Sequence, residues 1–283
     1  MRFPKLLLLL PLLALSRPVP APPAGVRTEN CRLCGLLAGP YTPRLAIPWI
    51  LDRLRPFGAA NPNGWGVAWF PRNRKFMGPI SRRGGRPANE DPRFPRAAWE
   101  AALHRPRAIL GHVRLSSTVL AGIPDPHPFV REGLALAHNG TVNRAAFFPL
   151  VLPFLKKRPP DYRDLSASAR PEFQVVDSEL LFIYLLGRRE ARGGDTAAAM
   201  KDLALAVRRV DPFATVNLLV SDGRSLWALS RGAPGNLLRF FHEPFTGTVV
   251  VASEGVAPSW WAQIPDWTIL VASRKGKIRL VKV

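Results

Sequence analysis

The stretch TENCRLCGLLAG, residues 28–39, contains both cysteines of the chain, Cys31 and Cys34. The apolar run that begins at Cys31 and closes at Gly39 predicts a buried strand. Residues three apart on a strand point to opposite faces of the sheet. We therefore expect the two sulfur atoms to face different layers, with Cys34 packed as a small, buried hydrophobic side chain.

Upstream of this stretch the chain begins with a leucine-rich segment. Arg2 and Lys5 precede an apolar core that is too short for a comfortable membrane span. Ala14 and Ser16 are small residues suited to cleavage of a secretory signal. We therefore expect export to the periplasm or the extracellular space. The alternative is a protein that stays anchored in the membrane by an uncleaved leader.

The sequence divides into two regions. Residues 1–30 are predicted to be a signal-like leader and propeptide that ends in a proline-rich spacer. Residues 31–283 show neither an internal repeat nor a linker and are predicted to form one domain. Hydrophobic residues make up 47% of the chain, enough to bury a sizeable core.

The formal net charge is +20, with arginine far more frequent than lysine. A basic surface can attract nucleic acid, anionic lipid or acidic substrates. The arginines are scattered, however, and no clump forms a long basic helix or a base-reading signature. We therefore expect no nucleic-acid partner and no stable membrane association once the leader is removed.

The rest of the chain alternates short apolar runs with helical stretches. Helices are expected at 43–55, 94–105, 144–158 (broken at its prolines), 177–191 and 196–210. Strands are expected at 31–39, 64–70, 108–117, 134–140, 214–222, 225–231, 248–254, 267–273 and 278–283. This order predicts an α+β protein in which antiparallel pairing dominates and the helices lie outside.

Polar residues gather where the predicted strands end. GHVRLSST presents Arg114 and Ser117, DPHPF presents His127, AHNGT presents Asn139 and Gly140, and VDSE presents Asp177. Each has a simpler explanation: Arg114 as a surface charge, Asn-Gly as a hairpin turn, and Asp177 with Ser178 as a helix cap.

Taken together, these motifs resemble those of the class II glutamine amidotransferases, which are N-terminal-nucleophile hydrolases. NCRLCGLLAG is similar to the opening of that family, and PNGWGVAWF to a stretch of its small stand-alone branch. GHVRLSST, HPF, HNGTV, DSE and VASE match further family motifs in the expected order. The resemblance spans about residues 31–280, so nearly everything after the leader.

The resemblance implies a role for each matching residue. Cys31 matches the nucleophile, and its own α-amine would act as the base after cleavage between Asn30 and Cys31. Asn139 and the backbone N–H of Gly140 match the oxyanion-stabilising pair.

The remaining matches concern the glutamyl end of the substrate. Arg114 matches the arginine that holds the α-carboxylate, and Asp177 matches the group that holds the α-ammonium. Ser117 stands where the family usually has threonine, and His127 is expected to support the pocket rather than to catalyse.

The resemblance further implies a four-layer αββα sandwich of two antiparallel sheets, with neither metal nor organic cofactor. The implied reaction is glutaminase-type or γ-glutamyl amide hydrolysis through a thioester on Cys31, acting on glutamine or a γ-glutamyl compound. Stand-alone members include hydrolases of γ-glutamyl compounds from ergothioneine synthesis and glutathione breakdown.

Two alternatives remain at this point. Cys31-Arg-Leu-Cys34 satisfies the bare C-x-x-C pattern of a thiol redox protein, although no βαβ unit surrounds it. A zinc site would need further ligands, and the sequence has no second C-x-x-C. The other alternative is a non-catalytic binding module on the same fold.

Overall fold

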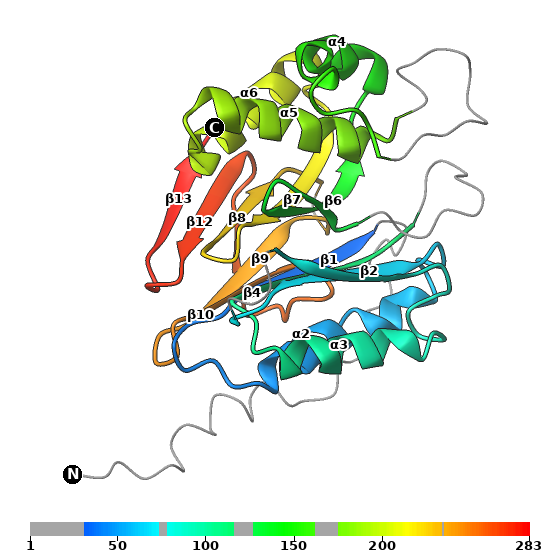
Figure 1. Ribbon diagram of the computed structural model, residues 1–283, viewed down its shortest axis with the longest axis vertical. Coiled ribbons are helices and arrows are strands. Elements are labelled where there is room, and N and C mark those ends of the chain that lie inside the picture. Colours follow the sequence, from blue (N-terminus) through cyan, green and yellow to red (C-terminus); the bar gives the residue numbers. More distant parts are fainter. Residues whose placement is uncertain (1–30, 74–77, 116–126, 162–174, 234) are drawn as a thin grey trace.

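The computed structural model describes residues 31–73, 78–115, 127–161, 175–233 and 235–283. Two antiparallel sheets lie face to face, and helices cover the outer side of each sheet (Figure 1). This confirms the predicted α+β class and the four-layer order that the resemblance implied.

The first sheet has seven strands, with β1 at its centre. In order across the sheet they are β11 (Ala262–Gln263), β9 (Leu238–Glu243), β10 (Thr248–Ser253), β1 (Arg32–Leu37), β4 (Ala108–Val113), β2 (Trp65–Phe70) and β3 (Ile80–Gly84). Every residue of β1 is buried, because a central strand between two layers has no solvent-facing side. This explains its continuous apolar sequence.

The second sheet has six strands. In order they are β13 (Ile278–Lys282), β12 (Thr268–Ser273), β8 (Ser225–Ser230), β7 (Thr215–Ser221), β6 (Leu134–Thr141) and β5 (Phe129–Arg131). β6 and β7 pair from Ala135 opposite Ser221 to Thr141 opposite Thr215.

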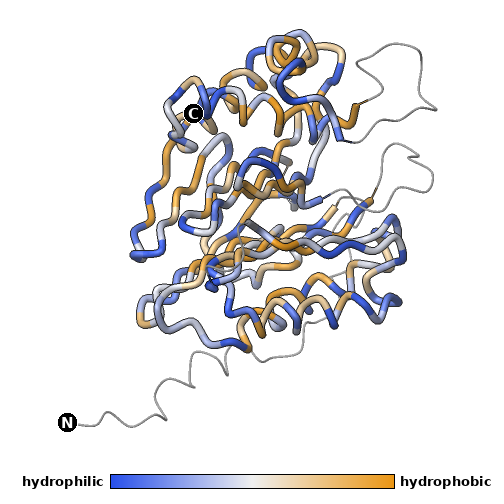
Figure 2. Tube along the Cα trace, viewed as in Figure 1, coloured by the Kyte–Doolittle hydropathy of each residue, from blue (hydrophilic) through white to orange (hydrophobic). Residues whose placement is uncertain are grey.

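The outer layers consist of helices. They are α2 (Ala46–Asp52), a 3-10 turn η1 (Arg55–Gly58), α3 (Arg93–Leu103), α4 (Arg144–Leu155), α5 (Asp177–Ala191) and α6 (Thr196–Val210). The helices α2 and α3 cover the first sheet, and α4, α5 and α6 cover the second (Figure 1). Along α3 the trace alternates between hydrophobic and hydrophilic residues, as expected for a helix with one face on a sheet (Figure 2).

Hydrophobic side chains fill three layers. One cluster lies between the sheets and includes Leu33 and Leu37 of β1. A second joins the first sheet to α2 and α3 and includes Cys34 and Leu36, and a third joins the second sheet to its helices. Odd-numbered residues of β1 therefore face the other sheet, and even-numbered ones face the helices.

The prolines of α4 do not break it, contrary to the sequence prediction. Pro149 and Pro153 lie inside a continuous helix and are exposed. They are four residues apart, so they share a face, and the carbonyl groups that lose an N–H partner lie on the solvent side. The helix also has a side-chain cap, because Asn143 Oδ1 accepts from the N–H of Ala146 at 3.1 Å.

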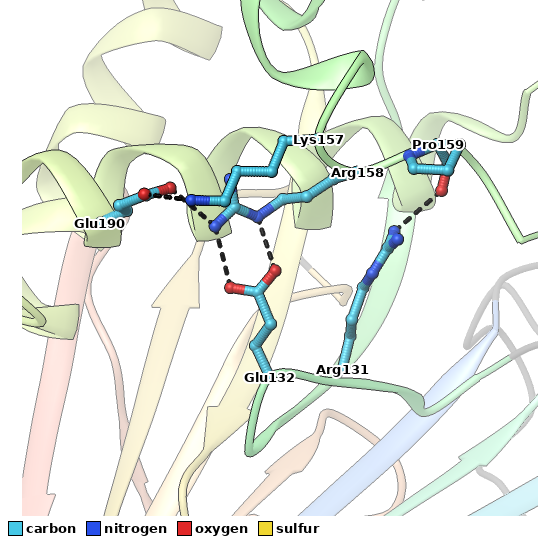
Figure 3. A network of polar contacts seen from close by, with 6 residues as sticks. All are labelled: Arg131, Glu132, Lys157, Arg158, Pro159 and Glu190. Carbon is cyan, nitrogen blue, oxygen red and sulfur yellow. Dashed lines mark hydrogen bonds and ion pairs between the residues drawn. The ribbon is translucent and has the colours of Figure 1, made fainter.

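The end of α4 is tied to two other elements by ion pairs (Figure 3). The buried Arg158 donates to both carboxylate oxygens of Glu132, at 2.7 and 2.9 Å, and to Glu190 at 2.9 Å. Lys157 also pairs with Glu190. Since Glu132 belongs to the β5–β6 turn and Glu190 to the end of α5, the network joins three segments of the second half of the domain.

A second polar contact fixes the edge of the first sheet. Trp65 Nε1 donates to Asp91 Oδ2 at 3.0 Å, and Arg93 donates to the same carboxylate at 2.8 Å. Gly84 passes beside them, where a Cβ would lie 2.5 Å from Asp91 Oδ2 and leave no room for a side chain. Burial alone would raise the pKa of Asp91, but the hydrogen bonds from Arg93 and Trp65 outweigh it and lower the pKa to about 2.

We predict that Asp91→Asn lowers the stability of the protein at neutral pH by about 2 kcal/mol. The folded-state pKa of Asp91 lies below its ordinary value of 3.8, so its contribution is fully present above about pH 4 and is lost as the pH falls toward 2. Urea denaturation at pH 7 and at pH 3 measures the free energy of unfolding of the wild type and of Asp91→Asn. The difference between wild type and variant should shrink at the lower pH, and a difference independent of pH contradicts the prediction. Glu100→Gln, which removes an exposed partner of Arg82, serves as the control and should change little.

Candidate active site

Cys31 lies immediately before β1 and is half-buried. Its Sγ accepts a hydrogen bond from the backbone N–H of Leu115 and donates one to the carbonyl oxygen of the same residue, both at 3.2 Å. Both contacts suit a protonated thiol. Once the proton leaves, the N–H contact still stabilises the sulfur, whereas the carbonyl contact does not.

The two cysteines face different layers, as predicted. The alternation of β1 puts Cys31 on the same face as Leu33, which packs between the two sheets. Cys34 packs in the helix-facing cluster, where its Sγ lies 3.8 Å from the carbonyl oxygen of Ile50. Burial raises the pKa of Cys34 to about 12. Both cysteines are free thiols, and their opposite orientations argue against a redox pair.

Arg114 follows β4 beside Cys31. The β1–β4 pairing sets Arg32 opposite Val113, so the residues just outside this pair, Cys31 and Arg114, adjoin at the same end of the sheet. Arg114 is buried, and its backbone is held by Gly64 and Asn63 at 2.9 and 3.1 Å. Its place in the alternation of β4 puts it on the face that looks toward the second sheet.

Asn139 and Gly140 lie near the C-terminal end of β6, in the second sheet. Asn139 alternates with Ala135 and Ala137, which belong to the inter-sheet cluster, so its side chain faces Cys31's layer. Asn139 Nδ2 donates to Asn236 Oδ1 at 3.0 Å, and one N–H of the amide remains for another acceptor. A Cβ on Gly140 would lie 1.8 Å from the carbonyl oxygen of Thr215, so only glycine fits.

Asp177 is the first residue of α5, and its carboxylate contacts the backbone directly after β6. Its Oδ2 accepts from the N–H of Val142 at 3.0 Å, and its Oδ1 accepts from the N–H of Ser178 at 2.8 Å. The cap position of the helix belongs to Val176, whose side chain makes no cap. The helix-cap explanation therefore does not describe Asp177, whose carboxylate instead ties the start of α5 to the end of β6 and keeps free lone pairs.

Three histidines support this end of the sandwich. His112 Nε2 donates to the backbone carbonyl of His138 at 3.0 Å and so links the two sheets. The ring of His127 packs on His112 with centroids 4.3 Å apart. A Cβ on Gly66 would lie 1.7 Å from the carbonyl oxygen of His127, so this glycine lets the His-Pro-Phe segment approach β2.

His138 is not placed to act as a base. It is buried, and burial lowers its pKa, which keeps the ring neutral. Its Nδ1 lies 2.8 Å from Ser178 Oγ, so the side chain points toward α5 rather than toward Cys31. His138 is therefore a packed residue near the end of β6.

The structure thus brings Cys31, Arg114, Asn139 and Gly140 to one end of the two facing strand layers, with Asp177 bound to the end of β6. His127 lies beside them through its contact with His112. Ser117 falls in residues 116–126, outside the residues that the structure describes.

Sequence reasoning missed three contributors to the site. Leu115 acts through its backbone, which leaves no mark in the sequence. Asn236 holds Asn139 from a loop in which no motif stands out. His112 was part of a quoted motif, and its signal was its position two residues before Arg114.

The described residues offer neither a candidate metal site nor a candidate membrane span. Within the described ranges, no three residues among histidine, cysteine, aspartate and glutamate group as a metal site would require. Within those same ranges, no helix combines the length and apolar character needed to cross a bilayer.

The chain is similar to known proteins along most of its length. The family model described as glutamine amidotransferases class-II matches residues 33–257. A curated relative, the gamma-glutamyl-hercynylcysteine sulfoxide hydrolase of Mycobacterium tuberculosis (strain H37Rv), is 31% identical over 271 residues, which cover 93% of this chain and 89% of the relative.

Solved structures share the fold. A glutamine aminotransferase class-II domain protein from Silicibacter pomeroyi aligns with a TM-score of 0.55 and 21% identity, covering 89% of this chain and 99% of that one. The glutamine phosphoribosylpyrophosphate amidotransferase from B. subtilis aligns with a TM-score of 0.55 and 12% identity, covering 89% of this chain and 49% of that one.

The different surroundings of the two cysteines predict different reactivity. In the folded protein at pH 7, iodoacetamide should label Cys31 and leave Cys34 unmodified, because burial keeps Cys34 protonated and inaccessible. Peptide mass mapping before and after denaturation reads this out, and the denatured chain should be labelled at both residues.

The matched variants complete the test. Cys34→Ala should keep the labelling of Cys31 and cost about 1 kcal/mol of stability, whereas Cys31→Ala should leave no reactive thiol in the folded protein. Equal labelling rates for the two wild-type cysteines contradict the prediction.

Proposed function

Because the chain belongs to the class II glutamine amidotransferases, we propose that it hydrolyses a γ-glutamyl amide bond through a thioester on Cys31 after residues 1–30 are removed. It is a cysteine-dependent amidohydrolase, and its family hydrolyses γ-glutamyl amides. The position of Cys31 carries the proposal. Cys31 lies immediately before the central strand β1 and faces the space between the two sheets, as Asn139 and Arg114 do.

Removal of the leader supplies the base. The new α-amine of Cys31 has a reference pKa of about 7.7–8.0, so near neutral pH it takes the thiol proton directly or through water. The thiolate attacks the γ-carbonyl carbon, and the backbone N–H of Leu115 steadies the sulfur beforehand. Without cleavage, the nitrogen of Cys31 remains an amide and is not basic.

The tetrahedral intermediate carries its negative charge on the former carbonyl oxygen. Asn139 Nδ2 has one N–H engaged with Asn236 and directs the other to this oxygen, together with the N–H of Gly140. The C–N bond then breaks, and the leaving amine takes the proton from the α-ammonium. Water attacks the resulting thioester, which releases glutamate and restores the thiol.

Two charges hold the glutamyl end. Arg114 binds the α-carboxylate as a two-pronged donor, and Asp177 binds the α-ammonium with the oxygen lone pairs that Val142 and Ser178 do not use. Ser117 adds a hydroxyl contact, and His127 supports the pocket without touching the reacting atoms. A substrate therefore needs a free α-amino acid end and a γ-amide.

The amine side of the substrate distinguishes a glutaminase from a hydrolase of larger γ-glutamyl compounds. The relative of 31% identity is named for a γ-glutamyl compound whose amine portion is larger than ammonia. We extend this to the present chain and propose a γ-glutamyl compound with a substituted amine as the preferred substrate, with glutamine as a slower one.

We also propose a two-step maturation with export. Signal cleavage near Ser16 is followed by removal of the remainder up to Asn30, and the small-molecule substrate is met outside the cytoplasm. The leucine-rich segment behind two basic residues supports this order.

Intact-mass measurement of the active protein tests the mechanism directly. The mature chain should begin at Cys31, and a glutamine-analogue electrophile should add one label to Cys31. Cys34→Ala should be labelled like wild type, and Cys31→Ala should not be labelled. Active protein that keeps Thr28 or Glu29 excludes the α-amine as the base and overturns the proposed mechanism.

Asn139→Ala tests the oxyanion site. We expect kcat for a γ-glutamyl anilide to fall by roughly 100- to 1000-fold, with a much smaller change in KM, because the amide acts on charge that develops only in the transition state. Asn143→Ala is the matched control: it removes the cap of α4, which costs about 1 kcal/mol of stability, and should leave kcat unchanged. Comparable kcat values for both variants contradict the assignment.

A further inference from the structure

A cavity of about 890 Å³ lies at the other end of the sandwich from Cys31. This cavity, which we call the basic pocket, is lined by five basic residues: Arg72, Arg107, Arg224, Arg274 and Lys275. Ser225 and Ser273 complete the lining, so no carboxylate lines it in the part of the chain that the structure describes.

The strand pairing fixes the distance from the catalytic end. Arg107 immediately precedes β4, whose first residue, Ala108, pairs with Leu37 at the far end of β1. Arg114 follows the last residue of the same strand. At about 3.3 Å per residue, Arg107 and Arg114 lie roughly 20 Å apart. In Figure 1 the β12–β13 turn accordingly lies on the opposite side of the molecule from the start of β1.

The basic pocket is built from segments of both sheets. The N–H of Arg107 donates to the carbonyl of Phe70 at 2.7 Å, and that of Arg274 donates to the carbonyl of Arg224 at 3.1 Å. Gly223 packs against Phe70, where a Cβ would lie 2.8 Å from the Phe70 Cβ. The β7–β8 turn is therefore held against the end of β2, and the arginines start from fixed backbone positions.

Among the described residues, no carboxylate lines the basic pocket to balance its positive charges. Asp222 is adjacent to the pocket in sequence. Its Oδ1 accepts from the N–H groups of Arg224 and Ser225, both at 2.7 Å, and so stabilises the β7–β8 turn. Arg274 Nε is buried and has no hydrogen-bond partner among the described residues. Burial lowers the pKa of Arg274, and the neighbouring Arg72 and Arg107 lower it further. An anion bound in the pocket would relieve the repulsion among these guanidinium groups.

We propose that the basic pocket binds a small, soluble oligophosphate, an anion with two or more linked phosphate groups. Planar guanidinium groups bind phosphate oxygens in pairs, and the serine hydroxyls add neutral donors. The volume is in the range of small-molecule sites. No aromatic side chain lines the pocket among the described residues, so it offers no platform on which nucleic-acid bases could stack.

Calorimetric titration of the whole mature protein with tripolyphosphate, at about 150 mM salt to screen diffuse attraction, tests the proposal. We expect saturable binding of one equivalent, and at least about tenfold weaker binding of inorganic phosphate, because a single phosphate reaches fewer of the guanidinium groups. The double variant Arg107→Gln/Arg274→Gln should weaken tripolyphosphate binding by about tenfold or more and leave basal γ-glutamyl hydrolysis unchanged.

Two further variants make the result decisive. Arg224→Gln/Lys275→Gln changes only exposed members of the pocket and should also weaken binding if the first variant folds poorly. Arg44→Gln/Arg96→Gln removes the same charge from exposed positions elsewhere and should stay within about twofold of wild type. The proposal is overturned by equal losses in pocket and control variants, by the absence of saturable binding, or by tighter binding of a single-stranded oligonucleotide or anionic vesicles than of tripolyphosphate.

Discussion

The hydrogen bond from His112 to the backbone carbonyl of His138 joins the two sheets at the end where the chemistry lies. It places β4 and β6 at a fixed separation, two residues from Arg114 on one side and one residue from Asn139 on the other. A buried hydrogen bond of this kind is worth only about 1 kcal/mol in net stability. Its larger effect is geometric, because groups on separate sheets must converge on one substrate to act together.

Much of this arrangement follows from the sequence. The candidate active-site residues stand at the ends of apolar runs. Antiparallel pairing of β1 with β4 therefore places Arg114 beside Cys31, whatever the conformation of the loops. The period of two along a strand also predicts that Cys31 and Cys34 face different layers, as they do. The motif order adds what periodicity cannot supply, namely which polar strand ends belong to one site.

The remainder depends on contacts that single-sequence patterns do not carry. Leu115 supports the thiol through its backbone, and Asn236 reaches Asn139 from a loop almost a hundred residues away. The strands β3 and β9 escaped prediction because ISRRG and LRFFHE mix charge with apolar residues, as strands away from the centre of a sheet can. In α4 the prolines pointed to a break, but their shared solvent-facing side lets the helix continue.

The ion-pair network around Arg158 has a consequence for affinity at long range. Asp177 and Glu190 stand on the same helix, thirteen residues and therefore about 20 Å apart, and Arg158 fixes Glu190 to the β5–β6 turn. One end of α5 is thus fixed to the β5–β6 turn, and its other end carries the Asp177 carboxylate proposed to bind the substrate. Substitutions at the fixed end can therefore shift α5 and change substrate affinity without replacing any residue that contacts the substrate. Natural variation can thus adjust affinity while the reacting groups stay the same.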